Sequence, residues 1–237
     1  MDNFISDDQK IMASAENYNR YLFSLIKPYL NGEVIEIGSG IGNITRQMLE
    51  TPSKISKLFC IEPDESCINS FKAITSQSRF PIQIIKGSFP ETYPSQTGVA
   101  DLIFSFNVLE HIKDDNGALF KSFELLKSSG YLFIYVPAFQ CLFGSMDKRL
   151  NHYRRYSKIQ LSKKLQSIGF KLIKCEYTNF VGFWAWLINN RIFKIKSQKP
   201  GQVKIFDNYI LPIQIQLEKY IRFPIGQNLY IIAQKML

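Results

Sequence analysis

The sequence is poor in the residues that usually build metal sites, and it lacks the long apolar runs that cross membranes. It contains two histidines and four cysteines in 237 residues. The cysteines form no C-x-x-C pair and have no histidine at ligand spacing, so we expect no metal site and reduced thiols. The longest apolar run covers nine residues, 180–188, whereas a spanning helix needs about 20. The acidic start over residues 1–8 does not resemble a secretory signal, so we expect a cytoplasmic protein.

Charge is distributed unevenly along the chain. Residues 1–147 carry 12 Lys and Arg against 17 Asp and Glu, whereas residues 148–199 carry 13 Lys and Arg against Glu176 alone. Such an asymmetry indicates an anionic partner, which can be nucleic acid, a phosphorylated small molecule or a membrane surface. A solvated lysine-rich face is the alternative interpretation.

Strand and helix patterns alternate up to Pro137. The alternation predicts βαβ units in an α/β fold with a doubly wound, mostly parallel sheet. Pro28 is expected to shorten or kink the first helix. The expected helices cover residues 13–30, 43–49, 64–76 and 117–126, and the expected strands cover 33–37, 57–62, 82–86, 102–106 and 131–136.

The pattern changes after Pro137. We expect a loop or lid over residues 138–160, a helix over 158–167, a strand over 170–177 and helical pieces over 180–222. A final strand is expected over residues 228–235, where it would close one edge of the sheet.

A glycine-rich turn follows the first expected strand. Gly38, Gly40 and Gly42 allow the backbone to approach a ligand at the carboxyl end of that strand, where open parallel sheets bind ligands. Asn43 occupies the third glycine position of a dinucleotide fingerprint. Glu36 would repel a pyrophosphate but attract an ammonium or sulfonium group. The turn therefore favours a cationic ligand over NAD.

A second carboxylate, Glu62, lies at the end of the second expected strand, 24 residues after Gly38. A carboxylate at this place can accept hydrogen bonds from both ribose hydroxyls of an adenosine. The alternative is a charge at the start of the following helix.

Three segments resemble the class I S-adenosylmethionine-dependent methyltransferases. They are VIEIGSGIGN at 34–43, CIEPD at 60–64 and DLIFSFNVLEHI at 101–112, and the NVLEH stretch resembles the small-molecule branch. The resemblance implies S-adenosyl-L-methionine as the cofactor. It also implies a seven-stranded Rossmann-like sheet with an antiparallel last strand and a lid of helical pieces. We therefore predict one methyltransferase domain over 1–237, with a cofactor-binding core at 13–137 and acceptor-binding insertions at 138–160 and 180–222.

The resemblance also assigns residues to the cofactor. Glu36 and the glycine turn would hold its methionine end, Glu62 would bind the ribose, and Ser88, where an Asp is usual, would meet the adenine. Tyr18 would close over the cofactor, and Asn107 would lie under its sulfonium. The full implied set is Tyr18, Glu36, Gly38, Ser39, Gly40, Gly42, Glu62, Pro63, Ser88, Phe89 and Asn107.

Both histidines fall where the resemblance places acceptor contacts. His111 follows the fourth expected strand, and His152 lies in NHYRRY at 151–156, which resembles the GH-x-RRY stretch of one branch. We predict both as catalytic, because a hydroxyl acceptor needs a base. Packing at a helix start is the alternative for His111.

The rest of the NHYRRY segment supplies candidates for acceptor binding. They are Tyr153, Arg154, Arg155 and Tyr156. Two adjacent arginines can grip a phosphate or carboxylate, and a lid salt-bridge cluster is the alternative.

The sequence thus predicts methyl transfer to a small-molecule or lipid- or sugar-linked acceptor that is anionic. The apolar run at 180–188 precedes Arg191, Lys194 and Lys196, which predicts membrane-surface contact through residues 180–196. Packing over the site or a homodimer contact is the alternative for this stretch. The main alternative is an RNA or DNA methyltransferase that uses the basic stretch, although no Pro-Pro-aromatic run follows Asn107. A nonenzymatic S-adenosylmethionine-binding protein and an NAD-dependent oxidoreductase are further alternatives.

Overall fold

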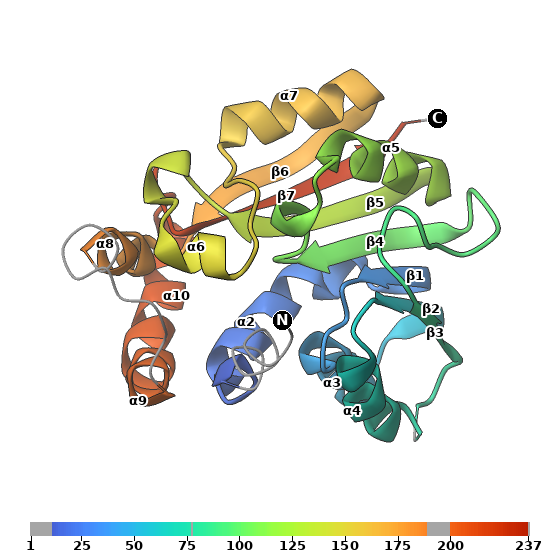
Figure 1. Cartoon of the computed structure of the whole chain (residues 1–237), viewed down its shortest axis with the longest axis horizontal. Coiled ribbons are helices and arrows are strands. Elements are labelled where there is room, and N and C mark those ends of the chain that lie inside the picture. Colours follow the sequence, from blue (N-terminus) through green and yellow to red (C-terminus); the bar gives the residue numbers. More distant parts are fainter. Residues whose placement is uncertain (1–10, 77, 189–199, 237) are drawn as a thin grey trace.

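The computed structural model describes residues 11–76, 78–188 and 200–236, and its centre is a seven-stranded sheet in the order β3-β2-β1-β4-β5-β7-β6 (Figure 1). The first five strands pair in parallel, and β7 pairs antiparallel with both β5 and β6. The predicted Rossmann-like sheet with an antiparallel last strand is confirmed. The strands are β1 Asn31–Ile37, β2 Lys54–Glu62, β3 Ile82–Lys86, β4 Ala100–Phe106, β5 Leu126–Pro137, β6 Phe170–Thr178 and β7 Asn228–Lys235.

Helices cover both faces of the sheet. The α-helices are α2 Glu16–Ile26, α3 Asn43–Glu50, α4 Glu65–Thr75, α5 Asp115–Leu125, α6 Ser145–Arg149, α7 Lys158–Ile168, α8 Phe180–Ile188, α9 Pro200–Ile205 and α10 Leu211–Tyr220. Short 3-10 turns are η1 Lys27–Tyr29, η2 Leu109–His111 and η3 Gln140–Leu142, and a π-helical segment, η5 Phe206–Ile210, joins α9 to α10. In Figure 1, α5 and α7 lie on one face, and α2, α3 and α4 lie on the other.

The core is divided into two layers by the sheet. Ile35 and Ile37 of β1 pack in one buried cluster with the apolar residues of α5 and α7. Val34, the residue before Ile35, points to the opposite face of the sheet and packs in the other cluster with α2, α3 and α4. Side chains alternate across a strand, so a strand that is covered on both faces must be apolar almost throughout. This packing fixes the carboxyl ends of β1 and β4, which carry the candidate site.

The end of the first helix and the position of the last strand can both be compared with the sequence predictions. The first helix ends at Ile26 and continues as the 3-10 turn that contains Pro28, so the predicted shortening is confirmed. The prediction that the last strand closes an edge is wrong, because β7 lies between β5 and β6. The first six residues of β7 are buried, whereas β6 exposes Lys171 and Lys174, as suits an edge strand.

The segments after Pro137 contain more regular structure than a loop. Residues 138–160 include η3, α6 and the start of α7, and residues 180–188 form α8. Arg191, Lys194 and Lys196 lie outside the described residues. Within the described ranges, every helix is too short or too polar to span a bilayer.

Candidate functional site

A cavity of about 640 Å³ lies at the carboxyl ends of the parallel strands. Its walls come from the turn after β1, the segment after β4, α2, α8, α9 and η5. Nine of the residues singled out in the sequence line it: Tyr18, Glu36, Gly38, Ser39, Gly40, Asn107, His111, His152 and Arg155. The described lining does not include Gly42, Glu62, Pro63, Ser88, Phe89, Tyr153, Arg154 or Tyr156.

The glycine turn has a conformation that requires glycine at two places. Gly38 has φ 73°, and a Cβ there would lie 2.4 Å from the side chain of Val108. Gly42 has φ 85°, and a Cβ there would lie 2.5 Å from the ring of Phe71. The turn therefore packs tightly against Val108 and Phe71. Because α3 begins directly after the turn, the first backbone N–H groups of this helix are available to a ligand.

Glu36 places a buried carboxyl group in the cavity wall. Its side chain is buried, its carboxylate accepts a hydrogen bond from the Thr45 hydroxyl, and the Cys60 thiol lies 3.9 Å away. Burial raises the pKa of Glu36 to about 8, despite the hydrogen bond from Thr45. A cation bound beside this carboxylate would offset the cost of its charge. Glu36 together with the cradle at Gly38 fits a cofactor that carries an ammonium group.

Glu62 is held against the same turn from the neighbouring strand. Its carboxylate accepts the backbone N–H of Gly40 at 2.7 Å and that of Asp64 at 3.0 Å. Burial raises the pKa of Glu62, and the two backbone donors oppose this shift. The contacts tie the end of β2 to the glycine turn. Pro63 beside it is exposed.

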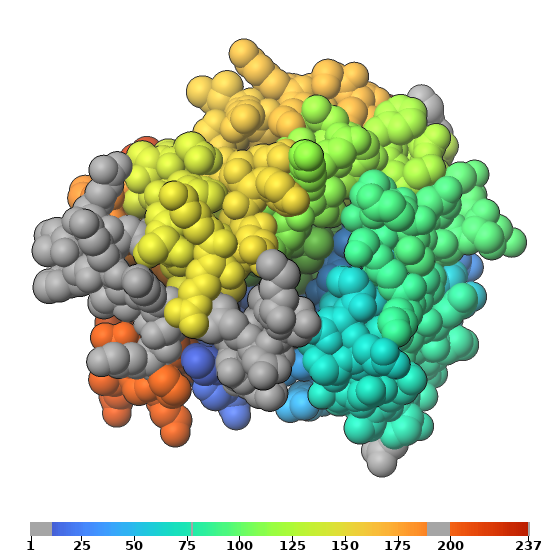
Figure 2. Space-filling view, in the orientation of Figure 1, coloured from blue at the N-terminus to red at the C-terminus, as the bar shows by residue number. Residues whose placement is uncertain are grey.

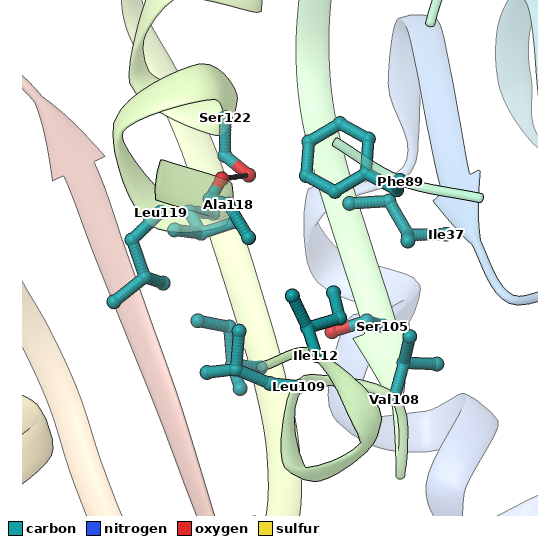
Figure 3. A pocket seen from close by; sticks show the side chains of 11 residues that line it. Ile37, Phe89, Ser105, Val108, Leu109, Ile112, Ala118, Leu119 and Ser122 are labelled. Atoms are coloured by element: carbon teal, nitrogen blue, oxygen red, sulfur yellow. Dashed lines mark hydrogen bonds between the residues drawn. The ribbon is translucent and has the colours of Figure 1, made fainter. Parts of the chain in front are cut away.

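Ser88 and Phe89 lie apart from the large cavity. Ser88 is exposed, whereas Phe89 is buried and packs in the core on the α5 side of the sheet. Figure 3 shows the Phe89 ring at a separate small void, with Ile37 beside it and Ala118 across from it. The void is lined mainly by apolar side chains. The Phe89 ring therefore contributes to the core, and its predicted contact with the adenine stays a prediction.

Three ionisable side chains meet on the far wall of the large cavity, and we call Glu110, His111 and His152 the EHH cluster. One ligand-capable atom from each lies within 4.8 Å of the others. The two imidazole ring centroids are 4.6 Å apart, with an interplanar angle of 87°. Burial raises the pKa of Glu110 to about 7 and lowers the pKa of His111 to about 4.

Asp147 supports this cluster from behind. Its carboxylate lies 3.0 Å from Nδ1 of His152 and accepts the Arg155 Nε–H at 2.7 Å. The sequence pattern did not single out Glu110 or Asp147. Glu110 stood within the NVLEH segment, so its adjacency to His111 was the available signal, whereas Asp147 gave none.

The NHYRRY candidates divide between the cavity and the protein interior. Arg155 is buried, lines the cavity, and stacks its guanidinium 4.9 Å from the Trp186 ring centroid. Arg154 lies 2.9 Å from Asp115. Tyr156 is fully buried and its hydroxyl lies 3.0 Å from the Asp115 carboxylate, while Tyr153 is 53% exposed. The alternative of a structural salt-bridge cluster therefore describes Arg154 and Tyr156 better than acceptor binding does.

Tyr18 on α2 forms part of the cavity roof. Its hydroxyl lies 3.0 Å from that of Tyr135, and burial raises the pKa of Tyr18 to about 12. Its backbone N–H donates to Asp207 of η5 at 2.8 Å. Asp207 was not apparent in the sequence, because no local pattern connects it to α2.

The arrangement can bind two different groups in one cavity. Glu36 and the glycine turn provide a site for a cationic molecule, and the EHH cluster provides imidazole and carboxylate groups for a second, polar one. Asn107 also lines the cavity, with φ 53° and its backbone N–H bonded to the Tyr135 carbonyl at 2.8 Å. Such a layout suits a transfer between two bound molecules.

Comparisons with known proteins agree with this arrangement. A family model described as a methyltransferase domain matches residues 14–174. No curated protein matches the sequence.

Solved structures of methyltransferases share the fold. A SAM-dependent methyltransferase from Archaeoglobus fulgidus is 18% identical with a TM-score of 0.64, and 99% of this chain and 100% of that chain are covered. A possible histamine N-methyltransferase from Thermotoga maritima is 17% identical with a TM-score of 0.65, with 98% and 96% covered. Phosphoethanolamine N-methyltransferase 2 from Haemonchus contortus, in complex with S-adenosyl-L-methionine, is 17% identical with a TM-score of 0.59, with 93% and 53% covered.

Proposed function

The chain belongs to the methyltransferase domain family as a class I S-adenosylmethionine-dependent methyltransferase, and from this premise we propose that its acceptor is a small or lipid- or sugar-linked molecule with an anionic group. The observation that carries the proposal is the single cavity of about 640 Å³ that joins the glycine turn to the EHH cluster. A cavity of this size suits a cofactor together with a small acceptor group.

The cofactor side of the proposal rests on the residues around the glycine turn. S-adenosyl-L-methionine supplies a methyl group that is already activated on a sulfonium. We propose that Glu36 attracts its ammonium group and that Gly38, Ser39 and Gly40 approach its methionine end. The Gly40 N–H is already bonded to Glu62, so Glu62 positions the turn and keeps acceptor capacity for the ribose hydroxyls.

The other predicted cofactor residues differ in whether they line the cavity. Tyr18 of α2 and Asn107, which follows β4, both line the cavity, and this supports their proposed roles over the cofactor and under its sulfonium. Gly42 supports the turn from its N-cap position before α3. Pro63, Ser88 and Phe89 lie outside the described lining. Their proposed contacts therefore require that the adenosine part of the cofactor extends past the residues that line the cavity.

The acceptor side of the proposal rests on His111 and His152. Both line the cavity, and Asp147 orients His152 through the contact at Nδ1. We propose that the two imidazoles meet the reacting hydroxyl or amine and assist the loss of its proton. The net positive charge of residues 148–199 supports an anionic group on the acceptor through its long-range field. Within the described lining of the cavity, the cationic side chain from this stretch is Arg155, which is paired with Asp147.

A lipid-linked acceptor has further support in a stripe of exposed apolar residues on α9, η5 and α10. Ile205, Tyr209, Ile213 and Leu217 are 59%, 71%, 65% and 49% exposed, and their spacing of four residues is that of one helix face. This orange segment lies at one corner of the molecule in Figure 2.

Charge on the same segment supports an anionic lipid surface as the partner of the stripe. Lys204 and Lys219 are exposed, whereas Asp207 is buried and Glu218 is half-buried. Apolar and aromatic side chains flanked by lysine suit the interface of an anionic bilayer. Ile205 also lines the cavity, so the stripe would bring a membrane-bound acceptor close to the EHH cluster.

An acceptor screen tests the proposed function. The protein would be incubated with S-adenosyl-L-methionine labelled on its methyl group and with separate pools of lipids, polar metabolites and RNA. Label in the lipid or anionic metabolite pool, lost in a His152→Ala variant, is expected. Label in the RNA pool alone would replace the proposal with the nucleic-acid alternative.

A further inference from the structure

The EHH cluster has a feature that methyl transfer does not explain, which is a buried carboxylate with no partner. Glu110 is 0% exposed. Neither of its carboxylate oxygens accepts a hydrogen bond from another described residue. A buried, unpaired carboxylate is costly, so proteins normally provide such a group with a donor or a cation.

Arg155 acts on Glu110 through its charge but makes no hydrogen bond to it, because the Arg155 side chain is already paired with Asp147. Arg155 donates its Nε–H to Asp147 at 2.7 Å, and both side chains are buried. The pairing with Asp147 leaves both carboxylate oxygens of Glu110 without a hydrogen-bond donor. The neighbours that Glu110 does have are two imidazoles, which are poor counter-charges while they are neutral but good metal ligands.

The geometry points to a site for a divalent transition-metal ion held by Glu110, His111 and His152, and we propose Zn²⁺ as the preferred ion. Two histidines and one glutamate form a known ligand set of open, catalytic zinc sites. The three ligand-capable atoms already lie within 4.8 Å of one another. Ligand bonds of about 2.0–2.2 Å need only a modest inward movement of these side chains.

The surroundings of the two histidines match those of metal ligands. Asp147 lies 3.0 Å from Nδ1 of His152, which leaves Nε2 for an ion. The ring of His111 hydrogen-bonds to the backbone of Leu150, which leaves its other nitrogen. Carboxylate and carbonyl partners of this kind orient ligating imidazoles and fix their tautomers. The sequence predicted no metal site, because that prediction weighed cysteine spacing and not a cluster formed between η2 and the segment after α6.

The location indicates what the ion would do. All three residues of the cluster line the large cavity, so coordination positions left open by the protein would face the acceptor. An oxygen of the acceptor bound there would be polarised, and the pKa of a hydroxyl would fall. With the ion bound, the two imidazoles would assist proton loss by holding the ion and not as bases, because their free lone pairs would be used in coordination. This inference deepens the proposed function and rests on it for the acceptor, whereas metal binding itself can be measured without any methyl transfer.

The test uses the full chain without a histidine tag, freed of metal with a chelator. Co²⁺ is titrated while visible absorption is recorded, and Zn²⁺ is then added in competition, with Mg²⁺ in a parallel sample. We expect one Co²⁺ per chain with the absorption of a low-coordinate site, displacement by Zn²⁺, and no displacement by Mg²⁺. Absence of stoichiometric Co²⁺ and Zn²⁺ binding would overturn the proposal.

Variants locate the ion. Glu110→Gln and His152→Ala are each expected to weaken Zn²⁺ binding at least about 10-fold, whereas Glu218→Gln, a half-buried carboxylate outside the cluster, should not. Glu110→Gln keeps the shape of the side chain, and thermal unfolding of the metal-free variant checks its folding. Equal Zn²⁺ affinity in all four proteins would also overturn the proposal. Calorimetry with S-adenosyl-L-methionine on the same samples separates this failure from failure of the proposed function.

Discussion

The carboxylate of Asp207 accepts the backbone N–H of Tyr18 at 2.8 Å, so η5 caps the start of α2 across 189 positions of sequence. The N-cap residue of α2 is Ala15, which offers no side-chain acceptor. Asp207 also accepts the backbone N–H of Asn17 at 3.1 Å. This contact fixes α2 to the segment that carries the exposed stripe, and it holds Tyr18 over the cavity.

Replacement of Asp207 by alanine should therefore lower stability and loosen the roof of the cavity. Two backbone donors at the helix start would lose their acceptor, which costs about 1–3 kcal/mol in the free energy of unfolding. Urea unfolding measures this loss. Asn208→Ala, at the exposed neighbour, is the control and should change stability by less than about 0.5 kcal/mol. Equal stability of both variants would contradict the capping role.

The two adjacent arginines should behave differently. Arg155→Ala leaves the buried Asp147 without its cation and should cost about 3–5 kcal/mol in the free energy of unfolding. Arg154→Ala should cost about 1 kcal/mol or less, because Asp115 keeps an ion pair with Lys164 at 2.7 Å. Chemical unfolding of both variants checks this order. Similar losses of unfolding free energy in the two variants would contradict a larger contribution of the buried Arg155–Asp147 pair.

Glu36 should make the stability of the ligand-free protein depend on pH. Its pKa is raised to about 8 in the folded protein from an ordinary value of 4.5. Between these values the folded chain keeps a proton that the unfolded chain releases, so this group lowers the free energy of unfolding as pH rises. Glu36→Gln removes this contribution.

The measurement compares the free energy of unfolding of Glu36→Gln with that of the unmodified protein at pH 5.5 and at pH 7.5. We expect the variant to gain about 1–3 kcal/mol relative to the unmodified protein over this interval. Glu50→Gln, at an exposed position on α3, should show no such gain. A constant difference between Glu36→Gln and the unmodified protein would contradict the buried, uncharged state of Glu36.

The exposed stripe on α9–α10 should bind anionic membranes. Ile213→Glu places a charge at a position that is 65% exposed, and it should reduce sedimentation with phosphatidylserine vesicles at least about fivefold, since it loses apolar burial and adds repulsion. Gln160→Glu adds the same charge on α7, across the molecule from α9 in Figure 1, and should have little effect. Ile213→Glu that bound vesicles normally but lost dimers would identify a second copy of the chain as the partner.

The sequence predicted the parallel half of the fold closely, because local signals dominate there. The strand at residues 82–86 was predicted with the bounds it has, and the glycine turn was placed directly before α3. The position of β7 was not predictable from its own residues. Apolar side chains on both faces show that the sheet is covered on both sides there, but they do not say which strands pair with β7 along its edges.

Site residues were predictable from the sequence only where they lie within a recognisable motif. Glu36 and the two histidines stood in recognisable segments, and all three line the cavity. Asp147 and Asp207 act through contacts with residues that no spacing rule connects to them, so the sequence did not indicate their roles. Arg154 and Arg155 look equivalent in sequence, and only packing distinguishes the cavity-lining side chain from the one paired with Asp115.

The most direct test of the account is calorimetric titration with S-adenosyl-L-methionine of the unmodified protein, Glu36→Gln and Glu50→Gln, with NAD as a second titrant. The account predicts one binding site per chain, affinity at least about 10-fold weaker in Glu36→Gln, no change in Glu50→Gln and no binding of NAD. Equal affinity in all three proteins, or binding of NAD alone, would contradict the placement of the cofactor against Glu36 and the glycine turn.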